Sequence, residues 1–372
     1  MSEGVVGERG DIDPAPGPEP GGAAHAADAA DQAATRPRGL LSRLLLPLKL
    51  GLAAALFAWL WRRGALDLGA LRGALGRWDL LCAALGLGAV NLTASAVRWQ
   101  LLLRGEGIDL PLSLAVRLTW IGHFWNMVFP GAVSGDAVKM YYVGAEVPAR
   151  REEAWTTVLA DRVIGLAALV ALSTLATLAS LEQVLARPEL RRTFVTMLAL
   201  LAVMAGGGAA LALGVGRRTP LADGLRARLP FAQSARRGYH ALLRLGRRPR
   251  VVLVAFTISF VAHGSAVFVA YLLGQAVGEA SLAPRQYGVV VPVALFSNAI
   301  PITPGGIGVG EQVLGRLFAW SGGLEAKGVA IMLLFRLQFF ALAAVGAVLY
   351  ALHRRPAAAP TAKSPVPPGL PS

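Results

Sequence analysis

The chain has 372 residues, of which 55% are hydrophobic and 16% are charged, and its mean hydropathy is +0.55. This composition is typical of a protein with several membrane-spanning segments and excludes an ordinary soluble domain. The net charge of +14 lies in loops between apolar segments rather than in a basic domain, which argues against nucleic acid as a partner, and the single cysteine, Cys82, excludes a disulfide framework.

The two ends of the chain lack apolar periodicity. Residues 1–38 are rich in Ala, Gly, Pro, Asp and Glu, and this composition predicts a disordered cytoplasmic N-terminal tail. Residues 354–372 are rich in Pro and Ala and predict a second disordered tail. Residues 39–353 are therefore predicted to form one membrane domain.

Six apolar segments are long enough to cross a bilayer as helices. Their predicted bounds are 44–61, 79–103, 154–180, 193–215, 251–275 and 328–352. Backbone polar groups inside a bilayer must be paired within the protein, which permits only helices and closed barrels. The segments lack the alternating pattern of barrel strands. The predicted fold class is therefore an all-α, polytopic integral membrane protein.

Two further apolar stretches, 112–143 and 286–320, are interrupted by proline and glycine. Proline removes an amide donor and disrupts the preceding helical turn, while glycine tolerates positive φ angles. Each stretch is therefore predicted to form a re-entrant pair of short helices that returns to the side from which it started. The predicted hinge residues are Pro130, Gly131, Gly135, Pro301, Pro304, Gly305 and Gly306.

The basic loops predict the orientation of the chain. Residues 216–250 contain ten arginines and one aspartate, and a loop of this kind stays in the cytoplasm. Counting spans from this loop places both termini in the cytoplasm. The expected location of the protein is the inner membrane of a bacterium. The two hairpins then enter from opposite sides. This orientation conflicts with the usual cytoplasmic location of basic residues at one loop, because it places Arg62, Arg63, Arg72 and Arg77 outside.

The two broken stretches resemble each other in polar residues. Each has an asparagine shortly before the break, Asn126 or Asn298, and an acid after it, Asp136 or Glu311. Paired interrupted segments in two halves of a membrane protein indicate a transport site near the midplane. We therefore predict an inverted pseudo-repeat. The alternative is two ordinary helix–loop–helix turns at the membrane surface.

Several polar residues lie within apolar segments, where an ionised group costs about 2.5–3.5 kcal/mol and needs a partner or a watery cavity. Asn91, Ser95 and Arg98 share one helix face because their spacing is i, i+4 and i+7. Arg98 could bind a lipid phosphate with its planar guanidinium. Alternatively, it extends toward the interface beside Trp99.

Asp161 and Arg162 are adjacent, so they point to different sides of their helix and each requires another partner. Arg336, about nine residues into the last span, is the strongest candidate for a buried functional cation. A purely structural ion pair that holds helices together is the alternative for Asp161 and Arg162. The expected partners are Asp136 or Glu311 for Arg162, and Lys139, Arg98 or Arg336 for Asp161.

No cofactor is predicted. His123 and His263 lie in apolar segments without the spacing of metal ligands, so each is interpreted as a hydrogen-bonded core residue. The glycines of 305–310 are not followed by Lys-Ser or Lys-Thr, which argues against a nucleotide site.

Three patches together resemble the lysylphosphatidylglycerol synthase transmembrane family, also called flippase-like integral membrane proteins. The patches are residues 91–102, residues 126–142 with Asp161 and Arg162, and residues 298–311. This chain departs from the family in having Ser134 where a glycine is usual and Lys139 where an arginine is usual. A lysine is a point charge without the bidentate geometry of arginine.

The resemblance implies a membrane domain that moves lipid between leaflets. In fused members it works beside a soluble aminoacyl-transferase domain. The present chain ends soon after its last span, so we expect it not to be an enzyme that makes lysyl-lipid, and a separate lipid-modifying enzyme is an expected partner beside the membrane lipids themselves.

The leading hypothesis is a translocase for an anionic or modified phospholipid, with the lipid tails left in the bilayer. An integral-membrane transferase that uses Asp136, Asp161 and Glu311 is one alternative. An accessory scaffold that uses the arginine-rich loop 216–250 on the membrane surface is another. The predicted path for the head group consists of Asn91, Arg98, Asn126, Asp136, Lys139, Asp161, Arg162, Asn298, Glu311 and Arg336.

Overall fold

The structure is a computed structural model that describes residues 58, 62, 67–128, 134–213, 243–298, 303 and 307–353. Every regular element in these ranges is a helix, which confirms the predicted fold class. Both predicted tails and nearly all of the predicted span 44–61 lie outside the described residues. The same holds for most of the arginine-rich loop and for every predicted hinge residue except Gly135.

Five long helices form the frame of the membrane domain. Each is long and apolar enough to cross a membrane, and together they match five of the six predicted spans. A helix of 28 residues, such as α4, is about 42 Å long and exceeds the hydrocarbon thickness of about 30 Å. The five helices are α4 (Trp78–Gly105), α7 (Arg151–Leu178), α9 (Pro188–Leu213), α12 (Pro249–Ala276) and α15 (Glu325–Leu352).

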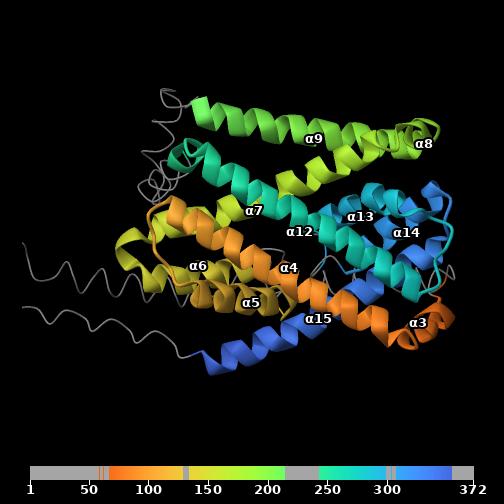
Figure 1. Cartoon of the computed structure of the whole chain (residues 1–372), viewed down its shortest axis with the longest axis horizontal. Helices are drawn as coiled ribbons and strands as arrows, with labels where there is room; N and C mark the ends of the chain where they lie inside the picture. Colours follow the sequence, from red (N-terminus) through yellow and green to blue (C-terminus); the bar gives the residue numbers. More distant parts are fainter. Residues whose placement is uncertain are drawn as a thin grey trace, which may run out of the picture. The chain divides into compact units, whose positions relative to one another are not determined.

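The two interrupted stretches form helical hairpins. The first consists of α5 (Leu112–Val128) and α6 (Ser134–Glu146), and the second of α13 (Pro284–Asn298) and α14 (Val309–Ser321). The helices of each hairpin pack against each other. The hairpins lie toward opposite ends of the long helices (Figure 1). Three short helices in the described ranges precede or follow long helices in the chain, namely α3 (Leu68–Leu75), η1 (Pro148–Arg150) and α8 (Leu181–Leu185).

The packing partners of the two halves correspond to one another. Helix α5 of the first hairpin packs on α15, and α13 of the second packs on α7. Likewise, α6 packs on α7 and α14 packs on α15, while α4 and α12 pack on each other. When α4, α5, α6 and α7 are exchanged in that order with α12, α13, α14 and α15, each of these helix contacts corresponds to an observed contact. An inverted repeat requires this correspondence. Each hairpin packs against several of the long helices.

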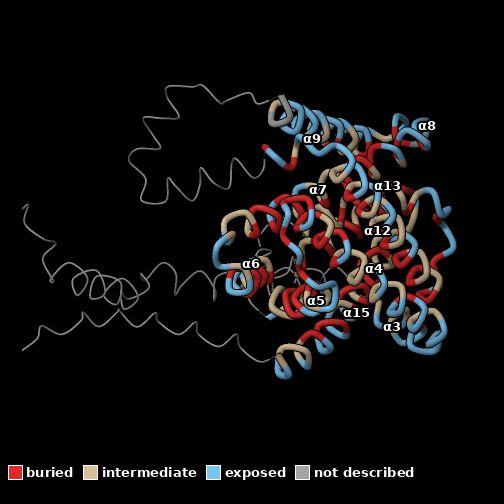
Figure 2. The backbone as a smooth tube through the Cα atoms, turned by 60° about the vertical axis from the view of Figure 1, so that its left-hand side comes forward, coloured by how far each residue is buried: buried red, intermediate tan, exposed pale blue. Residues whose placement is uncertain are grey.

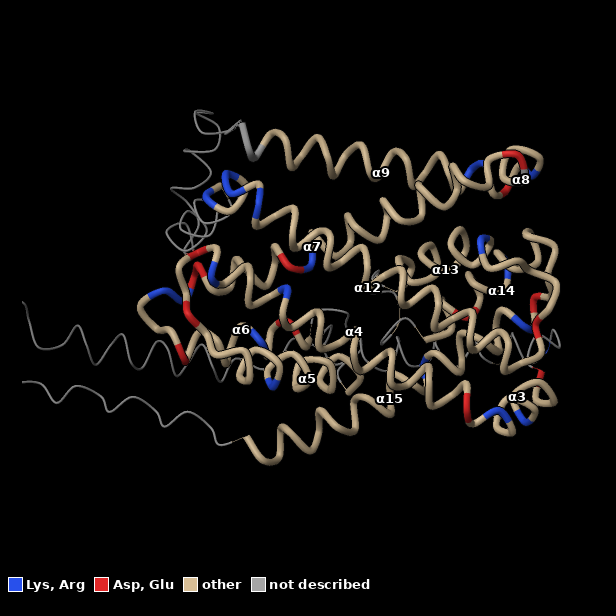
Figure 3. Tube along the Cα trace, viewed as in Figure 1, with Lys and Arg blue, Asp and Glu red and all other residues tan. Residues whose placement is uncertain are grey.

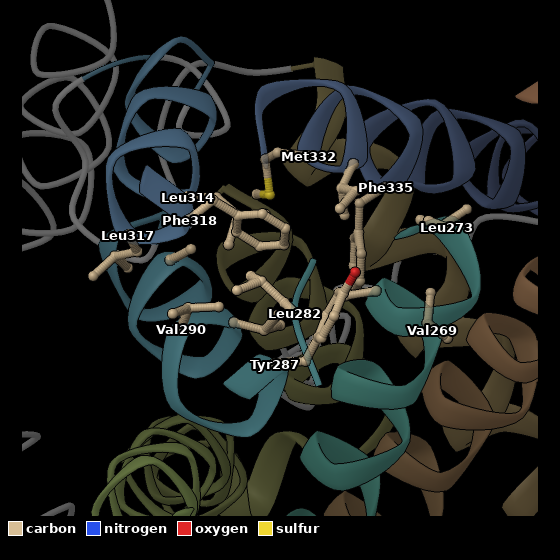
Figure 4. Close-up of a cluster of buried hydrophobic side chains, with 14 of the residues drawn as sticks. Val269, Leu273, Leu282, Tyr287, Val290, Leu314, Leu317, Phe318, Met332 and Phe335 are labelled. Carbon is tan, nitrogen blue, oxygen red and sulfur yellow. The ribbon is translucent and has the colours of Figure 1, made fainter. Parts of the chain in front are cut away.

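The buried core differs between the halves. In the second half, an apolar cluster joins α12, α13, α14 and α15, and includes Leu273, Tyr287, Leu314, Phe318 and Phe335 (Figure 4). A smaller cluster in the first half is centred on α4, α5, α6 and α7. Helix α9 is exposed along most of its length (Figure 2). Its apolar outer face is suited to contact with lipid.

Close approach of α5 and α15 depends on a glycine. A Cβ atom at Gly346 would collide with the carbonyl oxygen of Trp120 and lie 3.0 Å from Cβ of Phe124. We expect Gly346→Ala to lower the free energy of unfolding by about 1–3 kcal/mol, because the added methyl group overpacks the interface. Denaturant unfolding of the purified protein in detergent, followed by tryptophan fluorescence, measures this change.

The matched control is Gly264→Ala on α12, where a Cβ atom would meet no heavy atom within 4 Å. Alanine has a higher helix propensity than glycine, so this variant should be as stable as the parent or more stable by up to about 1 kcal/mol. Equal loss of stability in both variants would contradict the packing assigned to Gly346.

Candidate functional site

Arg98 is held by side chains from three helices. It is 8% exposed, and its Nε donates a hydrogen bond of 2.6 Å to Oδ1 of Asp161 on α7. Its Nη1 donates to Oγ of Ser259 on α12 at 2.8 Å, and its Nη2 donates to Oγ of Ser95 at 3.3 Å. Asn91, on the same face of α4, donates to a backbone carbonyl of α12 at 2.9 Å. Arg98 is therefore fixed inside the helix bundle and does not extend toward the interface.

Lys139 of α6 is a second buried cation beside Asp161. Its Nζ lies 3.9 Å from Oδ2 of Asp161 and 4.2 Å from the ring centroid of Trp99. The aromatic face attracts the ammonium group, as does the carboxylate. Arg98 and Lys139 thus share one carboxylate, and this three-residue cluster carries a formal net charge that is positive. A buried excess charge of this kind is costly unless an anion neutralises it.

Arg162 pairs with Asp136 of the first hairpin, and its Nη1 donates to Oδ2 of that carboxylate. The side chains are 28% and 16% exposed, so this ion pair is more accessible than the Arg98 cluster. Asp161 and Arg162 are adjacent yet have different partners, as their positions on the helix predict. The ion pair also links the N-terminal turn of α6 to α7.

Asn126 connects the two helices of the first hairpin. Its Oδ1 accepts a hydrogen bond of 2.7 Å from the backbone amide of Gly135. A Cβ atom at Gly135 would collide with the carbonyl oxygen of Gly122 and with the side chain of Asn126. Gly135 is therefore required for close packing of α5 and α6, whereas its role as a hinge stays a prediction.

The second hairpin repeats the close contact of this pair but not its hydrogen bond. A Cβ atom at Gly310 would collide with Oδ1 of Asn298, yet this oxygen accepts no hydrogen bond from the described residues. Oε1 of Glu311 accepts a 2.6 Å hydrogen bond from Nε of Arg336, and Oε2 accepts one of 3.1 Å from its Nη2. The amide of Gly308, whose φ of +82° favours glycine, also donates to Oε2 at 2.8 Å.

A cavity of about 290 Å³ lies at the charged residues of the first half and is called the charged cavity below. Charged residues occur within the long helices as well as at their ends (Figure 3). Among the described residues, three cations and two carboxylates line the cavity. The predicted site residues that line it are Asn91, Arg98, Asn126, Asp136, Lys139, Asp161 and Arg162.

A second cavity of about 380 Å³, the inner cavity, adjoins the first. Both cavities are lined by seven common residues, which include Asn91, His123, Asn126 and His263. Asn298 lines the inner cavity, and none of the described residues around it is charged. The structure thus places eight of the ten predicted path residues on two adjoining cavities.

Glu311 and Arg336 are the two exceptions. They contact each other and are not among the described residues that line either cavity. Their ion pair is fully buried and corresponds in position to the Asp136–Arg162 pair of the first half. In this structure the pair therefore joins the second hairpin to α15.

Sequence reasoning did not assign the histidines, Thr119 or Ser259 to the site. Nε2 of His123 lies 3.1 Å from the carbonyl oxygen of Phe339, and Nε2 of His263 lies 2.9 Å from that of Gly165. Both rings line the two cavities. His123 precedes Asn126 by one helical turn, a spacing that indicates a shared face. Within the described ranges, no group of three or more His, Cys, Asp or Glu side chains could hold a metal ion.

Comparison with known proteins adds a family assignment. Residues 46–346 match the family described as the lysylphosphatidylglycerol synthase TM region. The chain is also 24% identical over 286 residues to a UPF0104 membrane protein of Pyrococcus horikoshii, which covers 72% of this chain and 84% of that protein. No solved structure matches the chain. These matches confirm the family resemblance that the three sequence patches indicate.

Proposed function

This chain belongs to the lysylphosphatidylglycerol synthase TM region family, and we propose on this premise that it moves lipids with an anionic or modified head group between membrane leaflets. The observation that carries the proposal is the charged cavity, in which buried cations outnumber carboxylates by one. An anionic head group would neutralise this excess.

The physical requirement for lipid movement is a polar route through hydrocarbon about 30 Å thick. A charged head group cannot cross unaided at low cost, because burial without a partner disfavours ionised groups strongly. Arg98 and Lys139 provide charge at a position enclosed by long helices, and each hairpin consists of two separate helices. Interrupted helices in two inverted halves are characteristic of transport sites.

The order of events follows from accessibility. The Asp136–Arg162 pair is partly exposed, whereas Arg98, Lys139 and Asp161 are buried. A phosphate that enters the charged cavity meets Arg162 first and competes with Asp136 for it. It then reaches the more deeply buried Arg98 cluster, where charge-assisted hydrogen bonds are stronger.

Reconstitution tests this function. The purified protein is placed in vesicles of phosphatidylcholine that contain a trace of fluorescent phosphatidylglycerol, and the label in the outer leaflet is quenched with an impermeant reductant. Movement of lipid between leaflets raises the quenched fraction above that of protein-free vesicles. A quenched fraction equal to that of protein-free vesicles, in a system where an established scramblase is active, would refute the proposal.

We also propose that the loops at the α4–α5 end face the cytoplasm, as the arginine-rich segment 216–250 indicates. In a Cys82→Ser background, a cysteine at exposed Asp109 should be protected from an impermeant maleimide added to intact bacterial cells, while one at exposed Glu182 in α8 should react. Permeabilised cells should label both. The reverse pattern would show the opposite orientation.

A further inference from the structure

We infer that the inner cavity binds a hydrocarbon chain of the substrate, so that the protein encloses part of the lipid tail instead of leaving it in the bilayer. This inference rests on the proposed function and adds a second binding site to it. The relevant observation is the change in lining chemistry between two cavities that share seven residues.

The lining of the inner cavity is suited to an acyl chain. Described side chains on its wall include Met127, Leu169, Val269, Leu295, Phe335 and Leu342. None of the described lining residues is charged, whereas five charged residues line the adjoining cavity. Apolar surface favours hydrocarbon and gives no compensation for the desolvation of an ionised group. The charged part of a ligand therefore stays in the charged cavity.

The position of the inner cavity separates it from the ordinary lipid-facing surface. Its wall comes from α4, α5, α7, α12, α13 and α15, which belong to both halves of the repeat. Leu342 on this wall is 5% exposed, whereas Leu337 on the same helix is 58% exposed. Helix α15 therefore has an inner apolar surface and a separate outer apolar surface. A hydrocarbon chain in the inner cavity contacts the inner surface of this helix.

The residues shared by the two cavities determine which part of the lipid lies at the boundary between them. Asn91, Ser95, Asn126 and His263 lie where the charged lining gives way to the apolar lining. An amphiphile with its phosphate near Arg98 and Lys139 would place its ester or glycerol region at these uncharged polar groups. Ligand pockets commonly combine an apolar wall with a few placed polar groups in this way.

Photolabelling tests the inference. The probe is a phosphatidylglycerol with a diazirine near the end of one acyl chain, in vesicles of phosphatidylcholine that contain the purified protein. After irradiation, adducts are located by peptide mass spectrometry. We expect adducts at inner-wall residues such as Leu169 and Phe335, in addition to the lipid-facing surface. Adducts on outward-facing residues alone would overturn the inference.

Two tryptophan variants on α15 test whether labelling of the inner wall depends on the space in the inner cavity. Leu342→Trp narrows the inner cavity and should reduce adducts on the inner wall at least fivefold, while Leu337→Trp on the outer surface should leave them unchanged. Equal labelling in the two variants would also overturn the inference. If Leu342→Trp does not fold, the labelling map of the parent protein still decides the question.

Labelling and lipid movement are separate readouts. Inner-wall adducts without lipid movement would support the chain-binding site and contradict the translocase. Lipid movement with adducts confined to the outer surface would support the translocase and contradict the chain-binding site.

Discussion

Replacing Glu311 with glutamine is expected to lower the free energy of unfolding by about 3–5 kcal/mol, because it removes the carboxylate that neutralises the buried guanidinium of Arg336. The carboxylate is fully buried and accepts two hydrogen bonds from Arg336 and one from the amide of Gly308. Glutamine has nearly the same shape but presents an NH2 group to one of these donors. The loss is therefore electrostatic rather than steric.

Denaturant unfolding in detergent, followed by tryptophan fluorescence, measures the effect. The matched control is Glu325→Gln, since Glu325 is 29% exposed and forms a salt bridge of 3.6 Å with Arg316. Ion pairs accessible to solvent contribute about 0–1 kcal/mol. A loss below about 1 kcal/mol for Glu311→Gln would show that the pair does not hold the second hairpin.

The equivalent change in the first hairpin should have a smaller effect on stability. Asp136 and Arg162 are partly exposed, so water can solvate the arginine that Asp136→Asn leaves behind. The two halves therefore contain ion pairs at corresponding positions with different tasks. One is accessible from the charged cavity, and the other stabilises a packed apolar region.

The sequence predicts the frame of the fold because its signals are local. Apolar length identifies the five described spans, and proline and glycine identify the two interruptions. These features require no knowledge of how distant segments dock. The hydrogen bond between Asn126 and Gly135 joins residues that flank one break, but it is not predicted from the sequence.

The pairing of the buried charges required the structure. The sequence left Asp161 with three alternative partners, and the choice depends on how α4, α6 and α7 dock on one another. Ser259, which binds Arg98 from 161 positions away, has no local signal at all. The division of the predicted path into two cavities and a separate Glu311–Arg336 pair likewise depends on helix packing across both halves.

The largest functional effect is expected at Arg98. Loss of a hydrogen bond between a guanidinium and an anionic group costs about 1.5–3 kcal/mol, so Arg98→Gln should slow lipid movement by about 10–100-fold. Arg98→Lys keeps the positive charge but lacks the planar, bidentate guanidinium. Its rate of lipid movement should lie between those of the parent and Arg98→Gln. The vesicle assay with fluorescent phosphatidylglycerol measures all three rates, and Arg104→Gln at an exposed position on the same helix is the matched control.

A loss of activity in Arg98→Gln could arise because Asp161 loses its closest cation and the helices rearrange. The double variant Arg98→Gln/Asp161→Asn separates this cause from a direct role, because it removes the cation and its carboxylate together. If Arg98 only neutralises Asp161, the double variant should move lipid as fast as the parent. If Arg98 binds the head group, the double variant should remain slow although its stability recovers, since the buried cluster then lacks the Arg98 guanidinium and only Lys139 remains there to bind an anionic head group.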